Sequence, residues 1–490
     1  MRRLLGDTLV YGIGSSLTRF CGLLLFPVYA KLLSTDDYAG QDLALTLATL
    51  VQLMVGLGLD QGYARIYYER DESGRRNLAA TWGVAILCTT LVAMPVLLAL
   101  RYVIADLAAI RIDGAGELLL WAFGGAGLQL ALRQPMLTLR LRKQSVRFVL
   151  VSLATALGQL AFGLWLVKYK MLGAVGAGMA YAGGSLAGLL ASMIAVGWMW
   201  SGSWCWRDLR EMLAFGVPLL PAAAAAWFLE AVNRFILQHF SVPLQTAVFG
   251  VSVRIASILG LVLYGFQMAW GPYAYELMTR PKEAASAYVR AARWLWWVGG
   301  SGAVVLSLFA PELIAGLTKE EYVDADEVVP WLCLSYLVST FFSIAVIGYL
   351  YGKRTQHQII VLGAGCLVVA VLGPSVAAAF GAIGIGIVSL LAYWVASMLA
   401  ARASRKYLDV RFPWIWIMLW QLVILLSSVA LPRLLPTAEV LAIAAFWPVA
   451  LKLLIGAVVM CVGMLIMLAE SDIRMIIHSL DRLWFRSPKR

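Results

Sequence analysis

Charged side chains inside long apolar runs are the residues of this sequence that could do chemistry. Four of them are basic, namely Arg19, Arg234, Arg254 and Lys452. An unpaired arginine near the bilayer centre costs roughly 2.5–3.5 kcal/mol on insertion scales, so each such residue is expected to have a functional role or a partner. Guanidinium groups bind phosphate oxygens in a fork geometry. The sequence therefore predicts a cationic cavity for an anion, and a pyrophosphate headgroup on a lipid fits it best.

Three acidic residues accompany these cations, and they are candidates for coupling to a proton or sodium gradient. Asp60 and Glu230 are the main candidates, and Asp42, at the predicted start of a span, is the third. Glu230 precedes Arg234 by one helical turn, so the two can pair along one helix. A purely structural salt bridge and a coupling role are equally good interpretations of that pair.

The cysteines and histidines indicate no metal site. No two cysteines form a Cys-x-x-Cys pair, most lie in apolar runs, and the histidines do not cluster. We therefore predict no metal, no disulfide framework and no cofactor beyond an ion gradient. The residues concerned are Cys21, Cys88, Cys205, Cys333, Cys366, Cys461, His239, His357 and His478.

The composition predicts an all-α polytopic membrane protein, because 62% of the residues are hydrophobic and only 13% are charged. Hydrophobic windows predict about fourteen spans with short connections. Arg19 interrupts the first run, which favours a retained helix over a cleaved signal peptide. The predicted spans are 8–32, 42–64, 78–100, 118–139, 148–167, 174–199, 214–238, 246–270, 294–317, 329–350, 358–379, 382–401, 414–434 and 440–468.

The basic residues set the predicted orientation. With the N-terminus inside, the inner segments carry about four times as many Lys and Arg as the outer ones, which is a strong positive-inside signal. Arg133, at the predicted end of span four, is counted among these inner residues. Both termini are therefore predicted to be cytoplasmic. The net charge of +12 is mostly a topology signal, so nucleic acid is not expected as a partner. The acidic outer loop 318–328 is predicted to be exposed to solvent.

An internal repeat is predicted from two glycine-rich segments. GAVGAG from Gly173 and GAIGIG from Gly381 are separated by 208 residues, and Lys143 and Lys353 give a weaker match at 210. Chance recurrence of glycine-rich turns is the alternative. Six spans separate the copies, so the repeat is parallel, with a substrate site expected between the halves. The predicted domains are an N-terminal six-helix lobe (1–200), a C-terminal six-helix lobe (201–405), two additional helices (406–469) and a cytoplasmic amphipathic tail (470–490).

Several linked segments resemble the polysaccharide-transport (Wzx-like) branch of the multidrug/oligosaccharidyl-lipid/polysaccharide superfamily. They are SSLTRFCGLLLFPVYAKLLSTDDYAGQDLA, GLGLDQGYARIYYE, FGVPLLP followed by NRFIL, and VFGVSVRIASI followed by WGP. The resemblance implies a two-lobed flippase of the bacterial cytoplasmic membrane. Its implied substrate is an undecaprenyl-pyrophosphate-linked oligosaccharide, moved from the inner to the outer leaflet by alternating access. Its implied partners are that glycan, membrane lipid and a polysaccharide polymerase with other assembly proteins.

The same resemblance suggests roles for particular residues. By position, Arg19 and Arg254 match basic residues that line the cavity in flippases of lipid-linked sugars. The family often carries an acid just before the arginine of helix seven, whereas this chain has Asn233, and Glu230 is the nearest substitute. The last two helices resemble those that form a lipid-tail groove in peptidoglycan-precursor relatives.

Two other classes of protein are alternatives to a flippase for a lipid-linked oligosaccharide. A multidrug or small-solute exporter of the same fold would favour an acidic cavity, whereas the predicted cavity is basic. A membrane enzyme of polysaccharide assembly would be expected to carry one large outer loop or an intramembrane histidine. The sequence has neither feature, so a transporter is the leading prediction.

Overall fold

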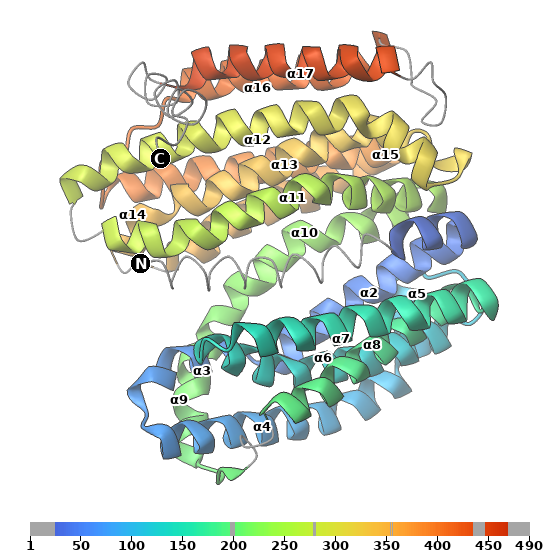
Figure 1. Cartoon of the computed structure of the whole chain (residues 1–490), viewed down its shortest axis with the longest axis vertical. Helices are drawn as coiled ribbons and strands as arrows, with labels where there is room; N and C mark the ends of the chain where they lie inside the picture. The colour runs from blue at the N-terminus through green and yellow to red at the C-terminus, as the bar shows by residue number, and fades with distance from the viewer. Residues whose placement is uncertain are drawn as a thin grey trace, which may run out of the picture. The chain divides into compact units, whose positions relative to one another are not determined.

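A computed structural model describes residues 25–196, 201–277, 281–352, 354, 356–434 and 446–468 (Figure 1). Every regular element in these residues is helical. The elements are α2 (Thr35–Gly56), α3 (Leu59–Ile66), η1 (Tyr67–Glu69), α4 (Glu72–Ala99), α5 (Arg101–Leu107), α6 (Ala115–Leu141), α7 (Ser145–Gly163), η2 (Leu164–Tyr169), α8 (Gly173–Val196), α9 (Trp206–Gly216), η4 (Val217–Leu219), α10 (Leu220–Phe240), α11 (Pro243–Leu277), α12 (Pro281–Leu317), η5 (Glu320–Tyr322), α13 (Ala325–Ala345), α14 (Ile347–Tyr351), α15 (Gln356–Arg405), α16 (Trp414–Leu434) and α17 (Phe446–Met467).

The helices confirm the predicted class of polytopic all-α membrane protein. Among the described residues, twelve helices are long and apolar enough to cross a membrane. One of them, α15, contains predicted spans eleven and twelve, which meet without a loop at Gly381 (φ 55°, ψ −138°). Most of predicted span one, 8–32, lies outside the described residues, and so does the predicted tail helix. The predicted number of fourteen is therefore approximate.

The start of α2 differs from the prediction for a local reason. The hydrophobic window places the span at 42–64, but the helix begins at Thr35. Ser34 caps it, because its hydroxyl accepts a hydrogen bond from the backbone N–H of Asp37 at 3.1 Å. The helix then stops at Gly56, and α3 follows after Leu57 and Gly58, both left-handed. Asp42 consequently lies inside a helix rather than at its start.

The chain forms two compact units. The first comprises residues 1–251, 317–319 and 370–385, and the second comprises 252–316, 320–369 and 386–490. In the first unit, α6 packs against α2, α4 and α8, and α7 packs against α8. These units do not follow the chain boundary at 200/201, since α9 and α10 belong to the first. The division into two sequence lobes, 1–200 and 201–405, stays a prediction.

Two glycines in the first unit have the same backbone conformation, at positions that the predicted repeat makes equivalent. Gly173, which opens α8, and Gly381, at the kink of α15, both have φ +55°, a conformation that glycine adopts most readily. A Cβ on Gly173 would lie 3.3 Å from the carboxylate of Asp37, and one on Gly381 would lie 2.4 Å from the side-chain oxygen of Gln245. Asp37 and Gln245 are separated by the same 208 residues as the two glycines. The offset of 208 residues therefore relates the contacts of the two glycines as well as their sequences.

A cluster of ion pairs holds the short helix α9 in the first unit. Arg70, in the turn between η1 and α4, donates to the carboxylates of Asp208 (2.9 Å) and Glu211 (2.6 Å) on α9. Burial lowers the pKa of Arg70, but the hydrogen bond to Asp208 and the charges of both carboxylates outweigh it and raise the pKa above its usual value. The cluster fixes α9 at the end of α3, which α9 contacts directly.

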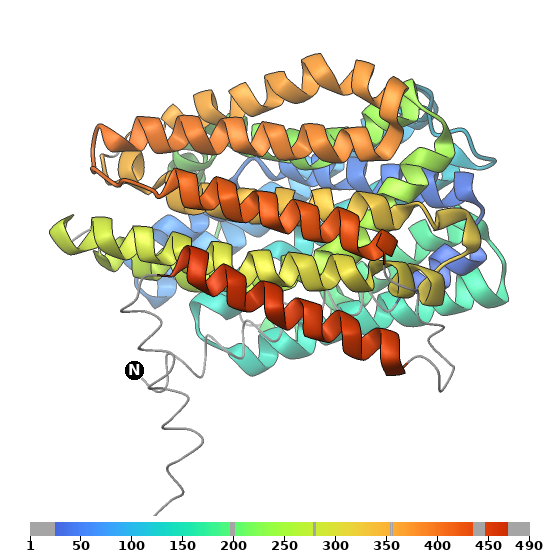
Figure 2. The ribbon, with the colours of Figure 1, turned by 90° about the horizontal axis from the view of Figure 1, so that it is seen from above.

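The two C-terminal helices belong to the second unit and pack against its α12 and α13. Trp420 of α16 donates from Nε1 to the backbone oxygen of Trp296 at 2.7 Å, and Trp297 donates to the backbone oxygen of Met460 of α17 at 2.9 Å. Arg433 of α16 pairs with Glu327 of α13 at 2.7 Å. Figure 2 shows α16 and α17 running side by side, consistent with their direct contacts.

Candidate functional site

One face of α2 carries a row of polar side chains. Asp42, Thr46, Thr49 and Gln52 follow one another at spacings of three and four residues, which places them on one side of a helix. The hydroxyl of Thr46 donates to the backbone oxygen of Asp42, and that of Thr49 donates to the backbone oxygen of Thr46. We call these four residues the polar stripe of α2. Polar groups at this depth in a membrane helix need partners, and three other helices supply them.

Asp42 is the carboxylate partner of Arg234. The Nε of Arg234, on α10, donates to Asp42 Oδ2 at 2.5 Å, and the two side chains are 12% and 9% exposed. The expected pair between Glu230 and Arg234 is therefore replaced by a pair between helices. Glu230 is exposed, and Arg234 reaches only its backbone oxygen, at 3.2 Å. An interhelical carboxylate can neutralise a buried guanidinium while also fixing α10 against α2, which a neighbour on the same helix cannot do.

The rest of the polar stripe receives donors from α6 and α10. Trp227 of α10 donates from Nε1 to the hydroxyl of Thr49 at 2.8 Å. Arg133 of α6 donates to the side-chain oxygen of Gln52 at 3.1 Å. The amide nitrogen of Gln52 then donates to the hydroxyl of Tyr181 of α8 at 2.9 Å. The polar stripe thus collects two arginines within one bundle of helices.

A second charged pair lies in the second unit. Lys452 of α17 pairs with Glu312 of α12, and the two side chains are 1% and 7% exposed. The ammonium group also lies 5.9 Å from the centre of the Phe309 ring. A buried charge is tolerated when an opposite charge and hydrogen bonds compensate it. Lys452 therefore stands in contact with an acid rather than with the interior of a cavity.

The remaining candidate residues are Arg254, Asp60 and Arg19. Arg254 lies on α11, in the second unit, with its side chain partly buried. Asp60 is in the first turn of α3, where a negative charge is favourable to the helix, and it accepts a hydrogen bond from Gln61 at 3.2 Å. Arg19 lies outside the described residues.

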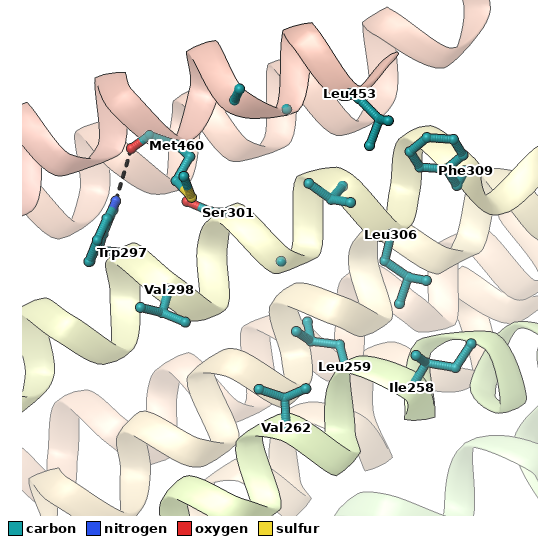
Figure 3. A pocket seen from close by; sticks show the side chains of 14 residues that line it. Ile258, Leu259, Val262, Trp297, Val298, Ser301, Leu306, Phe309, Leu453 and Met460 are labelled. Atoms are coloured by element: carbon teal, nitrogen blue, oxygen red, sulfur yellow. Dashed lines mark hydrogen bonds between the residues drawn. The ribbon is translucent and has the colours of Figure 1, made fainter. Parts of the chain in front are cut away.

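An apolar cavity of about 650 Å³ lies in the second unit, between α11, α12 and α17 (Figure 3). All fourteen residues that line it are uncharged, and Trp297, Phe309, Leu453 and Met460 are among them. Trp297 and Phe309 are spaced about 18 Å apart along α12. Glu312 lies three residues after Phe309 on α12, and Lys452 directly precedes Leu453 on α17. The cavity is therefore a long apolar hollow next to a buried charge pair.

Sequence reasoning missed Arg133, Gln52 and Glu312 as parts of these sites. Arg133 was assigned to an inner segment, although apolar residues continue beyond it and α6 runs on to Leu141. Glu312 lies inside predicted span nine, and a charged residue inside a span was the signal that could have identified it. Gln52 carries no charge, so only the contact with Arg133 and Tyr181 distinguishes it.

Comparison with known proteins gives a consistent assignment of the fold. The family model described as "Polysaccharide biosynthesis protein" matches residues 4–278, more than half of the chain. A search of curated proteins finds no match. The fold is similar to that of a lipid II flippase, MurJ, in an inward closed conformation. The identity is 13% and the TM-score 0.73, and 93% of this chain and 98% of that chain are covered.

Two transporters of the superfamily also share the fold. An inward-facing multidrug resistance MATE family transporter is 17% identical, with a TM-score of 0.64 and coverage of 81% of this chain and 97% of that one. A MOP superfamily transporter from Pyrococcus furiosus, described as having a binding pocket of reverse polarity that suggests a different function, is 16% identical. Its TM-score is 0.54, with 81% and 94% coverage.

Proposed function

Because the chain belongs to the polysaccharide biosynthesis protein family, within the multidrug/oligosaccharidyl-lipid/polysaccharide superfamily, we propose that it is a flippase for a lipid-linked oligosaccharide. The substrate is an undecaprenyl-pyrophosphate-linked glycan, moved from the inner to the outer leaflet of a bacterial cytoplasmic membrane. The product feeds exopolysaccharide, O-antigen or capsule synthesis, with a polymerase among the partners. The observation that carries the proposal is the polar stripe of α2, to which Arg133 of α6 and Arg234 of α10 each donate a hydrogen bond, at two positions about 15 Å apart along the helix.

The arginines would bind the pyrophosphate. Phosphate oxygens suit a guanidinium because two parallel N–H donors match them, and the bond strengthens where water is scarce. Arg19 and Arg254 are proposed as the primary contacts. Arg234 and Lys452 are proposed as further contacts, each of which has to leave a carboxylate before it can bind an anion.

The pair between Asp42 and Arg234 supplies a means of coupling. A proton or a sodium ion on Asp42 would cancel the carboxylate charge and weaken its ion pair with Arg234, and the guanidinium could then bind a phosphate. Release of the phosphate restores the pair. Asp60 and Glu230 stay secondary candidates for the ion, and alternating access between the two leaflets is driven by the gradient of that ion or by the membrane potential.

The apolar cavity in Figure 3 has the chemistry of a lipid-tail site. A polyprenyl chain is apolar and flexible, and a hollow about 18 Å long would hold several isoprene units. The fold similarity to MurJ supports this proposal, since that protein is by its name a flippase of a lipid, lipid II.

The decisive experiment measures surface polysaccharide in strains that carry Arg19→Ala or Arg254→Ala, with expression confirmed. We expect loss of polymer and accumulation of the lipid-linked precursor in the inner leaflet. Wild-type polymer in both strains would exclude the proposed anion site.

Export of small solutes is the second candidate function, and the similarity to a MATE family transporter favours it. The two functions differ in substrate charge, since a cationic drug would be repelled by the arginines that contact the polar stripe. A drug-susceptibility panel in a deletion strain separates them. Unchanged susceptibility together with lost polymer supports the flippase.

A further inference from the structure

Arg133, Gln52 and Tyr181 form a chain of hydrogen bonds that joins α6, α2 and α8 in the first unit. Arg133 donates to the side-chain oxygen of Gln52, and Gln52 donates to the hydroxyl of Tyr181. Gln52 is 8% exposed, so its amide is fixed by these two bonds. The Arg133 side chain is exposed. A buried amide thus holds one edge of an exposed guanidinium in place.

Arg133 lies at a depth where a charge is costly. The helix α6 has 27 residues and is about 40 Å long, and Arg133 stands about 12 Å before its end at Leu141. The hydrocarbon core of a bilayer is about 30 Å thick, so this position falls inside it. Arg234 and Lys452 meet the same cost by pairing with carboxylates. In the described part of the chain, the group that accepts from Arg133 is an amide oxygen instead.

The hydrogen bonds among Arg133, Gln52 and Tyr181 leave donor groups on Arg133 and Tyr181 that a ligand could use. A guanidinium has five N–H donors, and the bond to Gln52 uses one of them. The hydroxyl of Tyr181 accepts from Gln52, so its own proton is available to a further acceptor. A site of this composition is matched to an oxyanion, because it offers positive charge and N–H or O–H groups without a competing carboxylate.

We infer that Arg133 and Tyr181 are a phosphate subsite of the translocation path, with Gln52 as the residue that positions the guanidinium. Along α2, Gln52 is about 15 Å from Asp42, which holds Arg234. One pyrophosphate cannot span that distance, so the two arginines act in succession. With the predicted orientation, the binding site at Arg133 is nearer the cytoplasm and the binding site at Arg234 is nearer the outer face. This inference rests on the proposed function.

The phosphate could come from the lipid-linked substrate or from the headgroup of an ordinary anionic phospholipid. Binding to the full chain in detergent is therefore measured with three lipids: a polyprenyl pyrophosphate, a polyprenyl monophosphate and phosphatidylglycerol. The variants are Arg133→Gln, Arg133→Lys and Tyr181→Phe. Arg140→Gln is the matched control, because Arg140 is a second exposed arginine on α6 whose guanidinium lies 5.4 Å from the centre of the Phe148 ring.

The expected result is that Arg133→Gln weakens binding of the polyprenyl pyrophosphate roughly ten- to a hundredfold, the effect of one lost charge-assisted hydrogen bond. Arg133→Lys retains part of the affinity because it keeps the charge, and Tyr181→Phe lowers it several-fold. Arg140→Gln binds like the wild type. Melting temperatures identify a variant that fails to fold, in which case the Lys and Phe variants carry the test.

Three outcomes would overturn the inference. If Arg133→Gln binds the pyrophosphate like the wild type while Arg254→Ala binds it weakly, the subsite is wrong and the proposed function stands. If Arg133→Gln loses only phosphatidylglycerol, the residue contacts bulk lipid. If the wild type binds no polyprenyl phosphate and makes no polymer, the proposed function fails and the subsite fails with it.

Discussion

Asp42 and Arg234 form an ion pair between α2 and α10, although 192 residues separate them in the sequence. Both side chains are nearly buried, so each charge depends on the other. The pair joins a candidate for ion coupling to a candidate for substrate binding. That relationship gives the proposed flippase a physical link between ion binding and substrate binding.

Removing one partner of this pair is expected to destabilise the protein strongly. Asp42→Ala or Arg234→Ala removes one charge of a nearly buried ion pair, which costs about 3–5 kcal/mol. The double variant Asp42→Arg with Arg234→Asp restores the opposite charges, so much of the stability is expected to return while transport is not. Melting temperature in detergent measures the first effect and surface polymer measures the second. Glu230→Gln is the control, because Arg234 contacts only the backbone oxygen of Glu230. Equal stability of the single variants and the control would contradict the prediction.

The buried pair of Glu312 and Lys452 is expected to behave as one unit. Lys452→Met or Glu312→Gln alone removes one charge of this buried pair, at a cost of about 3–5 kcal/mol. Replacing both by Met removes both charges and is expected to be close to neutral. The measurement is a double-mutant cycle on the melting temperature, with Arg402→Gln on exposed surface as a control. Additive effects of the two single changes would show that the pair is not coupled.

The crossing of α2–α3 with α9–α10 is expected to tolerate no side chain. A Cβ on Gly216 would lie 2.2 Å from the backbone oxygen of Gly58, and one on Gly58 would lie 2.6 Å from that of Gly216. Gly216→Val therefore has to separate two backbones, which costs about 1–3 kcal/mol or more. Gly124→Ala is the control, since nothing lies within 4 Å of its Cβ. A stable Gly216→Val with wild-type polymer would mean that the contact is not close in the membrane.

Filling the apolar cavity is expected to impair transport without loss of stability. Val262→Trp places an indole in the hollow from an exposed position on α11, so it removes volume and disturbs little packing. Polymer is expected to fall, and the affinity for a long polyprenyl chain should fall more than that for a short one. Val92→Trp is the matched control, since Val92 is exposed in a separate apolar hollow of about 450 Å³ on α4. An equal effect of both variants on polymer would argue against a tail site.

The sequence alone determined the class of the protein and the approximate number of its spans, and it predicted a repeat. Membrane helices follow from continuous apolar runs, which are local, and the 208-residue offset was visible in two glycine-rich segments. The offset gained physical content only when Gly173 and Gly381 were found with the same φ beside Asp37 and Gln245. Helix ends were less certain, because a cap such as Ser34 lies outside the apolar run.

The tertiary structure decided which charges meet. Spacing along one helix offered Glu230 to Arg234, whereas the fold brought Asp42 to it, and the contact of Lys452 with Glu312 joins helices 140 residues apart. Arg133 was counted as a topology signal, and only the structure shows that it donates a hydrogen bond to Gln52 of α2. The reason is physical: the low dielectric of a membrane interior makes each buried charge depend on its partner. Which residue becomes the partner depends on how the helices pack against one another, and hydrophobic periodicity does not predict that packing.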